Sequence, residues 1–346
     1  MAEQDKQRGG MDAAPARVRM GDVATLAGVS PATVSRVFGS PELVSPSVRG
    51  AVLAAADKLG FRPNRLAGSF RNSKANIVGV IVPSLTTSFF AQTLQSLTRA
   101  LETMQYSVMV CSHDYDLDRE EKLLETLLEW SPSAVVTTGT AHTKQSMRLM
   151  LDAACPIVEM WDIGDNPIDS VVGFSNRDVG VAVAHHMWKS ERRKLAFVGR
   201  SLDRDQRGAA RCAGFVETIV QLGGTRPHVI ALPDQSTAAG GVEAFGTLMD
   251  QHPDIDGIAF SNDILAIGGI FEAMRRGISI PGDVSIVGYG DLDFASSVHP
   301  SLTTVRPPHD RIGTEVAQLL ARRFAGDDSS PRKVDLGFEF IARMSG

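Results

Sequence analysis

The sequence predicts an α/β protein in two parts: an N-terminal head of three short helices and a much longer body of parallel β-sheets covered by helices. Three observations predict it. Helical segments before residue 61 begin and end at strong capping residues. From Ile77 onward, short apolar runs alternate with amphipathic helical stretches, which is typical of parallel sheets covered on both faces. The chain, at 346 residues, is too long for one ordinary compact domain.

Charge is distributed unevenly along the chain. The formal net charge is -5, yet the segment from Arg17 to Lys74 has nine basic and only three acidic residues. The remainder of the chain is therefore strongly acidic. This asymmetry indicates a basic module for a polyanion, joined to a body that has another task.

Several classes of protein are disfavoured by the sequence. No stretch approaches the ~20 apolar residues of a membrane span, and residues 1–19 lack the apolar core of a signal peptide. The three cysteines are scattered without metal-ligand spacing. We find no P-loop, GxGxxG, HExxH or GxSxG motif. We therefore expect a cytoplasmic protein that is not an enzyme, binds no metal, needs no cofactor and does not enter a membrane.

The head begins after residues 1–17, which have no periodicity and are expected to be disordered. Asp22 is predicted to cap the first helix, and Gly28 to end it. Ser30 is the predicted N-cap of the second helix, and Pro31 takes its first position. Two short helices joined by a tight glycine-containing turn form a helix-turn-helix.

The second helix has two distinct faces. Val34 and Val37 share one face, while Thr33 and Arg36 lie away from it. A third helix begins at Ser45 and ends at Gly60, with a buried stripe formed by Val48, Val52, Ala55, Ala56 and Leu59. Such a trio buries a small core and leaves the start of the second helix free to enter a major groove.

These segments carry a family resemblance. The string Asp22-Val-Ala-Thr-Leu-Ala-Gly-Val-Ser-Pro-Ala-Thr-Val-Ser-Arg-Val37 closely resembles the LacI/GalR family of bacterial repressors, and Gly60-Phe-Arg-Pro-Asn-Arg-Leu-Ala67 resembles the hinge helix of that family. The resemblance continues along the body. It implies a helix-turn-helix DNA-binding domain at 18–61, a hinge helix and linker at 62–76, and a two-lobed effector-binding and dimerisation domain at 77–346.

The resemblance implies a double-stranded DNA operator as the partner of the head. The residues expected to contact bases and phosphates in the major groove are Ser30, Pro31, Ala32, Thr33, Ser35 and Arg36. Those expected in the minor groove are Asn64, Arg65, Ala67 and Phe70. Phe70 departs from the leucine with which the family usually wedges between base steps. Packing of Phe70 against the body is the alternative.

The body contains nine predicted strands: Ile77–Val82, Ser107–Cys111, Ala134–Thr138, Ile157–Met160, Val171–Phe174, Leu195–Val198, Val229–Leu232, Gly257–Phe260 and Val284–Val287. Two Rossmann-like lobes accommodate them, and a TIM barrel is the alternative. The resemblance favours two lobes of the periplasmic-binding-protein type, crossed by the chain near 168–176, 288–306 and 326–335. Ligands would then bind between the lobes, at the carboxyl ends of the strands.

The resemblance also implies which residues line an effector cleft: Ser84, Phe89, Phe90, Arg207, Arg211, Asn262 and Asp263. Core packing is the alternative for the aromatic residues, solvent exposure for the arginines and helix capping for Asn262 and Asp263. Most family members have an aspartate directly after the aromatic residue at position 289, where this chain has Gly290. The hydroxyl-binding carboxylate is thus missing or shifted to Asp291.

Five shorter segments resemble the gluconate-operon repressors of the family: Val82-Pro-Ser-Leu-Thr86, Thr138-Gly-Thr-Ala-His-Thr143, Ile157-Val-Glu-Met-Trp-Asp162, Val172-Gly-Phe-Ser175 and Val334-Asp-Leu-Gly-Phe338. They imply a sugar acid such as gluconate as effector. Arg207 and Arg211 suit its carboxylate by charge-assisted pairing. Glu159 and Asp162 suit its hydroxyl groups, and Trp161 is expected near the cleft.

Together these features predict a transcriptional repressor whose affinity for a palindromic operator is controlled allosterically by the effector. No leucine heptad follows Arg343, so we expect a homodimer. Two alternatives are a binding-only sugar receptor and a co-repressed regulator with a different small-molecule effector.

Overall fold

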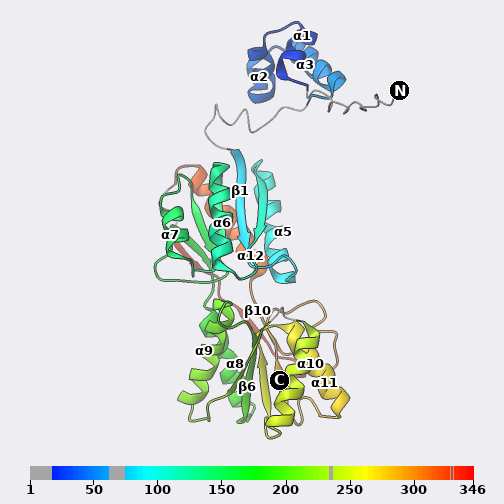
Figure 1. Ribbon diagram of the computed structural model, residues 1–346, viewed down its shortest axis with the longest axis vertical. Helices are drawn as coiled ribbons and strands as arrows, with labels where there is room; N and C mark the ends of the chain where they lie inside the picture. The colour runs from blue at the N-terminus through cyan, green and yellow to red at the C-terminus, as the bar shows by residue number, and fades with distance from the viewer. Residues whose placement is uncertain (1–17, 62–74, 234–236, 328, 330) are drawn as a thin grey trace, which may run out of the picture. The chain divides into compact units, whose positions relative to one another are not determined.

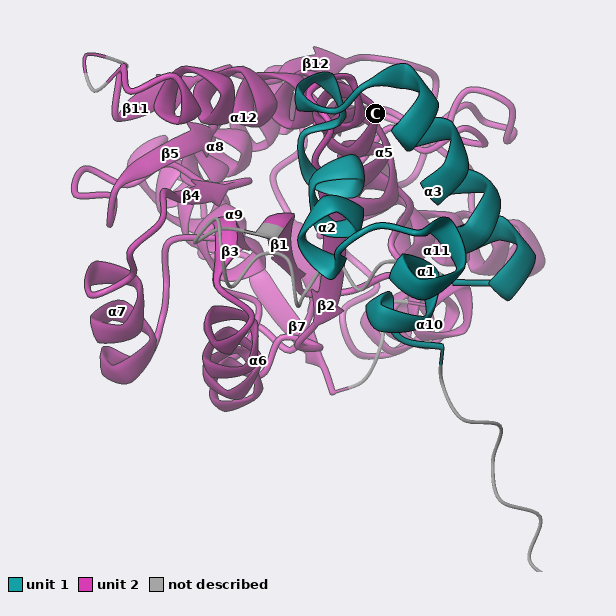
Figure 2. Cartoon of the chain, turned by 90° about the horizontal axis from the view of Figure 1, so that it is seen from above, with its two compact units in different colours: residues 1–75 teal, residues 76–346 magenta. Residues whose placement is uncertain are grey.

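The computed structural model describes residues 18–61, 75–233, 237–327, 329 and 331–346. The chain divides into two compact units at position 75, coloured separately in Figure 2. The predicted hinge residues Asn64, Arg65, Ala67 and Phe70 lie outside the described residues, as do residues 1–17.

The head contains three α-helices, α1 (Met20–Ala27), α2 (Pro31–Gly39) and α3 (Pro46–Leu59), with a short 3-10 helix, η1 (Pro41–Leu43), between the last two. Its core is made mainly of small β-branched and alanine side chains: Val23, Ala24, Val34, Val37, Val52, Ala55 and Ala56. The predicted stripe on α3 is confirmed, since Val48 and Leu59 pack against this core.

The caps of the head follow the sequence signals with two exceptions, and the first is Ser45, which stands at the N-cap of α3 but forms no side-chain capping hydrogen bond. Gly28 and Gly60 adopt the left-handed conformation that ends α1 and α3, at φ of 67° and 64°. The prediction that Asp22 caps α1 is wrong. Met20 packs against the core and the helix begins there, so Arg19 is the N-cap. Asp22 is then the third helical residue, and its carboxylate accepts the Arg19 backbone N–H at 2.7 Å.

The first lobe of the body is built on a six-stranded sheet of order β11-β5-β4-β3-β1-β2. Its strands are β1 (Ala75–Val82), β2 (Ser107–Ser112), β3 (Pro132–Thr138), β4 (Ile157–Met160), β5 (Ser170–Gly173) and β11 (Lys333–Asp335). The pairs β1–β2, β3–β4, β4–β5 and β5–β11 are parallel. Its helices are α5 (Ser88–Thr103), α6 (Leu117–Glu129), α7 (Lys144–Leu151) and the late α12 (His309–Phe324), which packs along α5.

The second lobe is built on a parallel sheet of order β7-β6-β8-β9. Its strands are β6 (Leu195–Arg200), β7 (His228–Leu232), β8 (Gly257–Phe260) and β9 (Ser285–Val287). Its helices pack as the pairs α8 (Asn176–Lys189) with α9 (Gln206–Gln221), and α10 (Ala238–Gln251) with α11 (Asp263–Arg276). The two separate sheets confirm the two-lobed prediction and exclude the TIM barrel.

All nine predicted strands are present within two residues of their expected bounds. The sequence analysis missed β10 (Thr304–Arg306) and β12 (Glu339–Ile341), which pair antiparallel, and also β11. In Figure 1, β10 lies where the chain passes between the two sheets. The third crossing was predicted too early, since β11 still pairs with β5 of the first lobe. The chain therefore crosses after Asp335.

No helix in the described ranges is both long and apolar enough to cross a bilayer.

Candidate functional site

The start of α2 is an exposed part of the helix-turn-helix. Pro31, Ala32 and Arg36 are exposed, and Thr33 and Ser35 are partly exposed. Val34 and Val37 turn into the core. Ser30 caps the helix, because its hydroxyl accepts the Thr33 backbone N–H at 3.1 Å. Helix α2 thus offers its N-terminus, together with the Arg36 cation of its last turn, to an approaching anion such as a phosphate.

A pocket lies in the body, at the carboxyl ends of strands from both lobes. The predicted residues that line it are Ser84, Phe89, Phe90, Trp161, Arg207, Arg211 and Asn262. Ser84 follows β1 and Trp161 follows β4 in the first lobe, while Asn262 stands after β8 in the second. Parallel sheets bring these distant segments to common edges, which explains why they meet.

One wall of the pocket is aromatic. The ring centroids of Phe89 and Phe90 each lie 5.1 Å from that of Trp161, and Phe89 also approaches Tyr289 at 6.0 Å. Burial raises the pKa of Tyr289 to about 12, so its hydroxyl stays protonated at neutral pH. Such a wall suits the C–H groups of a polyol, and the indole N–H of Trp161 has no hydrogen-bond acceptor among the described residues.

Two cationic side chains of the pocket, Arg207 and Arg211, come from α9. Arg211 is held by the protein: it donates to Asn176 Oδ1 at 2.6 Å, stacks on Tyr289 at 4.0 Å and lies 3.9 Å from the Asp205 carboxylate. Arg207 donates to the Thr138 carbonyl at 3.2 Å. Within the described ranges, no carboxylate pairs with Arg207.

Arg207 is only 8 % exposed. A buried charge without a counter-ion is costly, so an anionic ligand at Arg207 would relieve an existing penalty. The pocket therefore combines a buried cation that has no carboxylate partner among the described residues with an aromatic wall.

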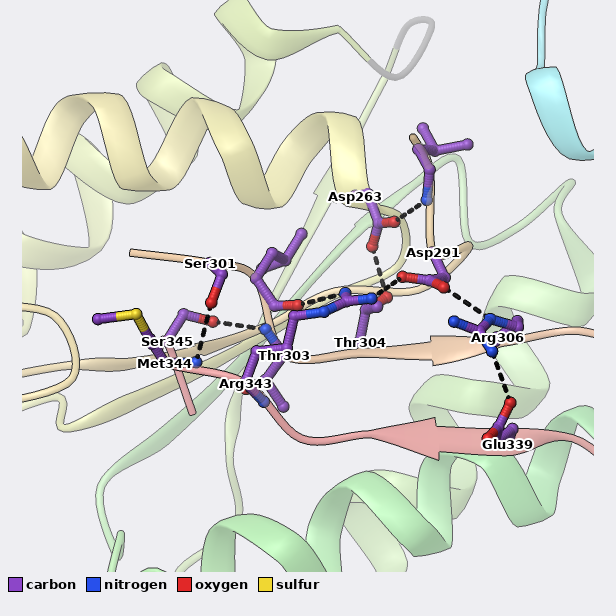
Figure 3. A network of polar contacts seen from close by, with 12 residues as sticks. Asp263, Asp291, Ser301, Thr303, Thr304, Arg306, Glu339, Arg343, Met344 and Ser345 are labelled. Atoms are coloured by element: carbon purple, nitrogen blue, oxygen red, sulfur yellow. Dashed lines mark hydrogen bonds and ion pairs between the residues drawn. The ribbon is translucent and has the colours of Figure 1, made fainter. Parts of the chain in front are cut away.

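Four predicted effector residues do not line the pocket. Glu159 accepts the Ile168 backbone N–H at 2.8 Å. Asp162 accepts from the Ile163 backbone N–H and from the Asn176 amide. Asp263 and Asp291 belong to the polar network of Figure 3. The carboxylates are thus engaged within the protein.

Asn262 both caps a helix and lines the pocket. Its side chain caps α11 by accepting the Leu265 backbone N–H at 3.0 Å, and the residue lines the pocket.

Ten further lining residues were not predicted from the sequence: Thr86, Thr87, Asp114, Tyr115, Arg200, Asp205, Ser261, Ile264, Tyr289 and Leu292. A usable signal was present for several of them. Asp114 and Tyr115 follow β2, Ser261 follows β8, and Arg200 ends β6. Applying the carboxyl-end rule to every predicted strand, and not only to segments with a family match, would have selected them.

No cluster of three or more His, Cys, Asp or Glu residues in the described part of the chain is placed to hold a metal ion.

Comparisons with known proteins agree with both parts of the chain. Residues 19–64 match the family model of bacterial regulatory proteins, lacI family, and residues 184–345 match a periplasmic binding protein-like domain. The HTH-type transcriptional regulator GntR of Escherichia coli K12 is 31% identical, covering 92% of this chain and 95% of its own. The regulator of the same name from Pseudomonas aeruginosa is 33% identical, covering 95% and 96%.

Solved structures show the same similarity. A LacI family transcriptional regulator from Silicibacter pomeroyi has a TM-score of 0.90 at 30% identity, covering 95% of this chain and 99% of that one. The transcription regulator GntR from Chromobacterium violaceum has a TM-score of 0.74 at 30% identity, covering 78% and 98%.

Proposed function

Because this chain belongs to the lacI family of bacterial regulatory proteins, we propose that it is a transcriptional repressor that binds a palindromic operator as a homodimer and responds to a sugar acid. The head supplies the exposed and partly exposed residues of α2 for the operator: Pro31, Ala32, Thr33, Ser35 and Arg36. The body supplies the pocket. A sugar acid made available for catabolism favours induction, in which the effector weakens the hold on DNA.

The observation that carries the effector class is the buried, carboxylate-free cation of Arg207 beside an aromatic wall. A neutral sugar would leave that charge uncompensated, whereas the carboxylate of gluconate would pair with it. The five segments that resemble gluconate-operon repressors support the same ligand. The alternative effector, a different small molecule, should share the anionic group.

Titration of tryptophan emission with D-gluconate tests this ligand. Trp161 lines the pocket, so gluconate should change the emission of the wild type, and Trp161→Phe should remove that change. Arg207→Gln should weaken gluconate binding about tenfold or more, because a hydrogen bond to a charged group contributes about 1.5–3 kcal/mol. Glucitol, which lacks the carboxylate, should bind both proteins weakly.

Arg204→Gln is the matched control, since Arg204 is exposed and does not line the pocket. Gluconate affinity that is equal in the Arg207→Gln variant and the wild type would refute the sugar-acid proposal. Such a result would leave the DNA-binding proposal standing.

A binding-only sugar receptor would use the same pocket. The exposed residues of α2 and the excess of basic residues between Arg17 and Lys74 favour the repressor, because a receptor needs neither. Retention of the full chain by operator DNA distinguishes the two. We propose no enzymatic activity, and the dimer is tested by sedimentation of the full chain.

A further inference from the structure

Two of the segments that join the lobes lie side by side. β10 leads directly into α12, whose His309 carbonyl accepts the hydroxyl of Thr93 on α5 in the first lobe, at 2.9 Å. β12 follows β11, which pairs with β5 of the first lobe. Because β10 and β12 also pair with each other, residues on these strands are positioned to follow any movement between the lobes.

The carboxylate of Asp291 forms ion pairs with arginines of both segments. Asp291 Oδ2 accepts from Arg306 Nε of β10 at 2.7 Å, and Asp291 Oδ1 lies 2.7 Å from the Arg343 guanidinium, just after β12. Arg306 also donates to Glu339 of β12 at 2.8 Å. Figure 3 shows Asp291 between the two arginines. The Asp291 side chain is only 9% exposed.

The loop that carries Asp291 is also a wall of the pocket. Tyr289 and Leu292, on either side of it, line the pocket, and the Gly290 N–H donates to the Val305 carbonyl of β10 at 2.8 Å. Asp291 has a φ of 47°, a left-handed conformation that is strained for aspartate and must be held by its surroundings. The two arginines provide that restraint.

Asp263 also links the pocket loop to β10, through two further hydrogen bonds. One of its carboxylate oxygens accepts the Leu292 backbone N–H at 2.8 Å, and the other accepts the hydroxyl of Thr304 in β10 at 2.6 Å. Asp263 starts α11 directly after the pocket residue Asn262. The pocket wall and the crossover strands therefore share hydrogen bonds through two aspartates.

We propose that Asp291 is a positioning residue and not an effector ligand: its ion pairs with Arg306 and Arg343 fasten both crossover strands to the pocket loop. Effector contact at Tyr289 or Leu292 then changes the arrangement of the lobes through this loop. Both carboxylate oxygens of Asp291 are already occupied, and a ligand hydroxyl could replace an arginine only by leaving that cation uncompensated. The effector part of this inference rests on the proposed function.

Hydrogen exchange of the ligand-free full chain tests whether the ion pairs of Asp291 restrain the two crossover strands. Asp291→Asn should speed amide exchange about tenfold or more in 304–306 and 339–343, and leave β6 and the head unchanged. Asp293→Asn, at an exposed neighbouring position, should exchange like the wild type. Unchanged exchange of both crossover segments in Asp291→Asn would overturn the proposal.

If Asp291→Asn fails to fold, Arg306→Gln tests the same restraint of the crossover strands. The Arg306 side chain is 43% exposed, so its loss leaves the core intact. It removes one of the two ion pairs of Asp291, together with the Arg306–Glu339 pair, and should speed exchange in the same two segments. An Arg306→Gln protein without that local effect would contradict the proposal.

The effector response tests the consequence. Asp291→Asn should keep its Kd for D-gluconate within roughly a factor of two of the wild type, as expected for a residue without ligand contact. The change in operator affinity caused by gluconate should shrink about tenfold. Loss of gluconate binding with an intact response at saturation would show Asp291 to be a ligand. A wild-type protein that does not bind gluconate or DNA would contradict the proposed function. The hydrogen-exchange experiment would still test the ion pairs of Asp291.

Discussion

His142 illustrates how much a single residue depends on neighbours that are distant in sequence. Its side chain is 1% exposed, and its Nδ1 lies 2.6 Å from Glu120 of α6 while its Nε2 lies 3.5 Å from Glu159 of β4. Burial alone would lower the pKa of His142, but the two carboxylates outweigh it and raise this pKa to about 9. His113, 3.9 Å from Glu120, has its pKa lowered mainly by burial.

This cluster predicts a pH-dependent stability. The pKa of His142 is higher in the folded chain than its ordinary 6.5, so its stabilising effect is complete below pH 6.5 and is lost as the pH rises through about 9. The full effect is on the order of 3 kcal/mol. Relative to His142→Gln, the wild type should therefore have its largest excess of unfolding free energy near pH 6 and little near pH 10.

Urea unfolding followed by tryptophan emission measures this difference, with exposed His185→Gln as a control for removing a histidine. A difference between wild type and His142→Gln that grows with pH would mean that His142 is not held as a cation between the carboxylates.

The dependence of a side chain on neighbours that are distant in sequence also explains which site residues could be predicted from the sequence. Arg207, Phe89 and Trp161 were predicted from segments matching the family and do line the pocket. Glu159 was matched to a ligand hydroxyl, but the chain places it against His142 and the Ile168 backbone. A carboxylate's partner is set by tertiary packing, and nothing local to residue 159 encodes the position of His142.

At the scale of elements, α8 packs closely on α9. A Cβ added at Gly180 would lie 2.0 Å from the backbone oxygen of Arg211. A backbone atom cannot move aside cheaply, so this glycine sets the distance between the two helices. It thereby also sets the position of Arg211 beside the pocket.

Gly180→Ala should therefore destabilise the body by at least about 1–3 kcal/mol, the usual cost of overpacking, and weaken gluconate binding by shifting Arg211. Gly50→Ala in α3 is the contrasting change, because an added Cβ there meets nothing within 4 Å. It should stabilise the head by about 0.5–1 kcal/mol through helix propensity. Thermal unfolding by circular dichroism measures both. A neutral Gly180→Ala protein would show that the helices can separate freely.

Element prediction succeeded where the pattern was long and failed where it was short. The nine predicted strands have largely apolar runs, and each was found. The three missed strands, β10, β11 and β12, have three residues each, as β9 does, but each of them contains a charged residue, whereas β9 continues an apolar run that starts at Val284. They are defined by pairing partners elsewhere in the chain. The third lobe crossing was placed too early for the same reason.

At the scale of the whole molecule, function requires a head and a body with different charges and different ligands. The segment before residue 75 has an excess of basic residues, while the rest is acidic enough to give a net charge of -5. Sequence could predict this division because composition changes sharply between the two parts. It could not supply the network around Asp291, which joins residues from three separate segments.

Operator affinity of the full chain, measured with and without saturating D-gluconate over a range of salt concentrations, tests the account most directly. The duplex is one selected by the protein from a randomised palindromic library. We predict sequence-specific binding that falls steeply with salt, as phosphate contacts by a basic head require, and that weakens about tenfold or more when gluconate is added. Binding without sequence preference, insensitive both to salt and to gluconate, would contradict it.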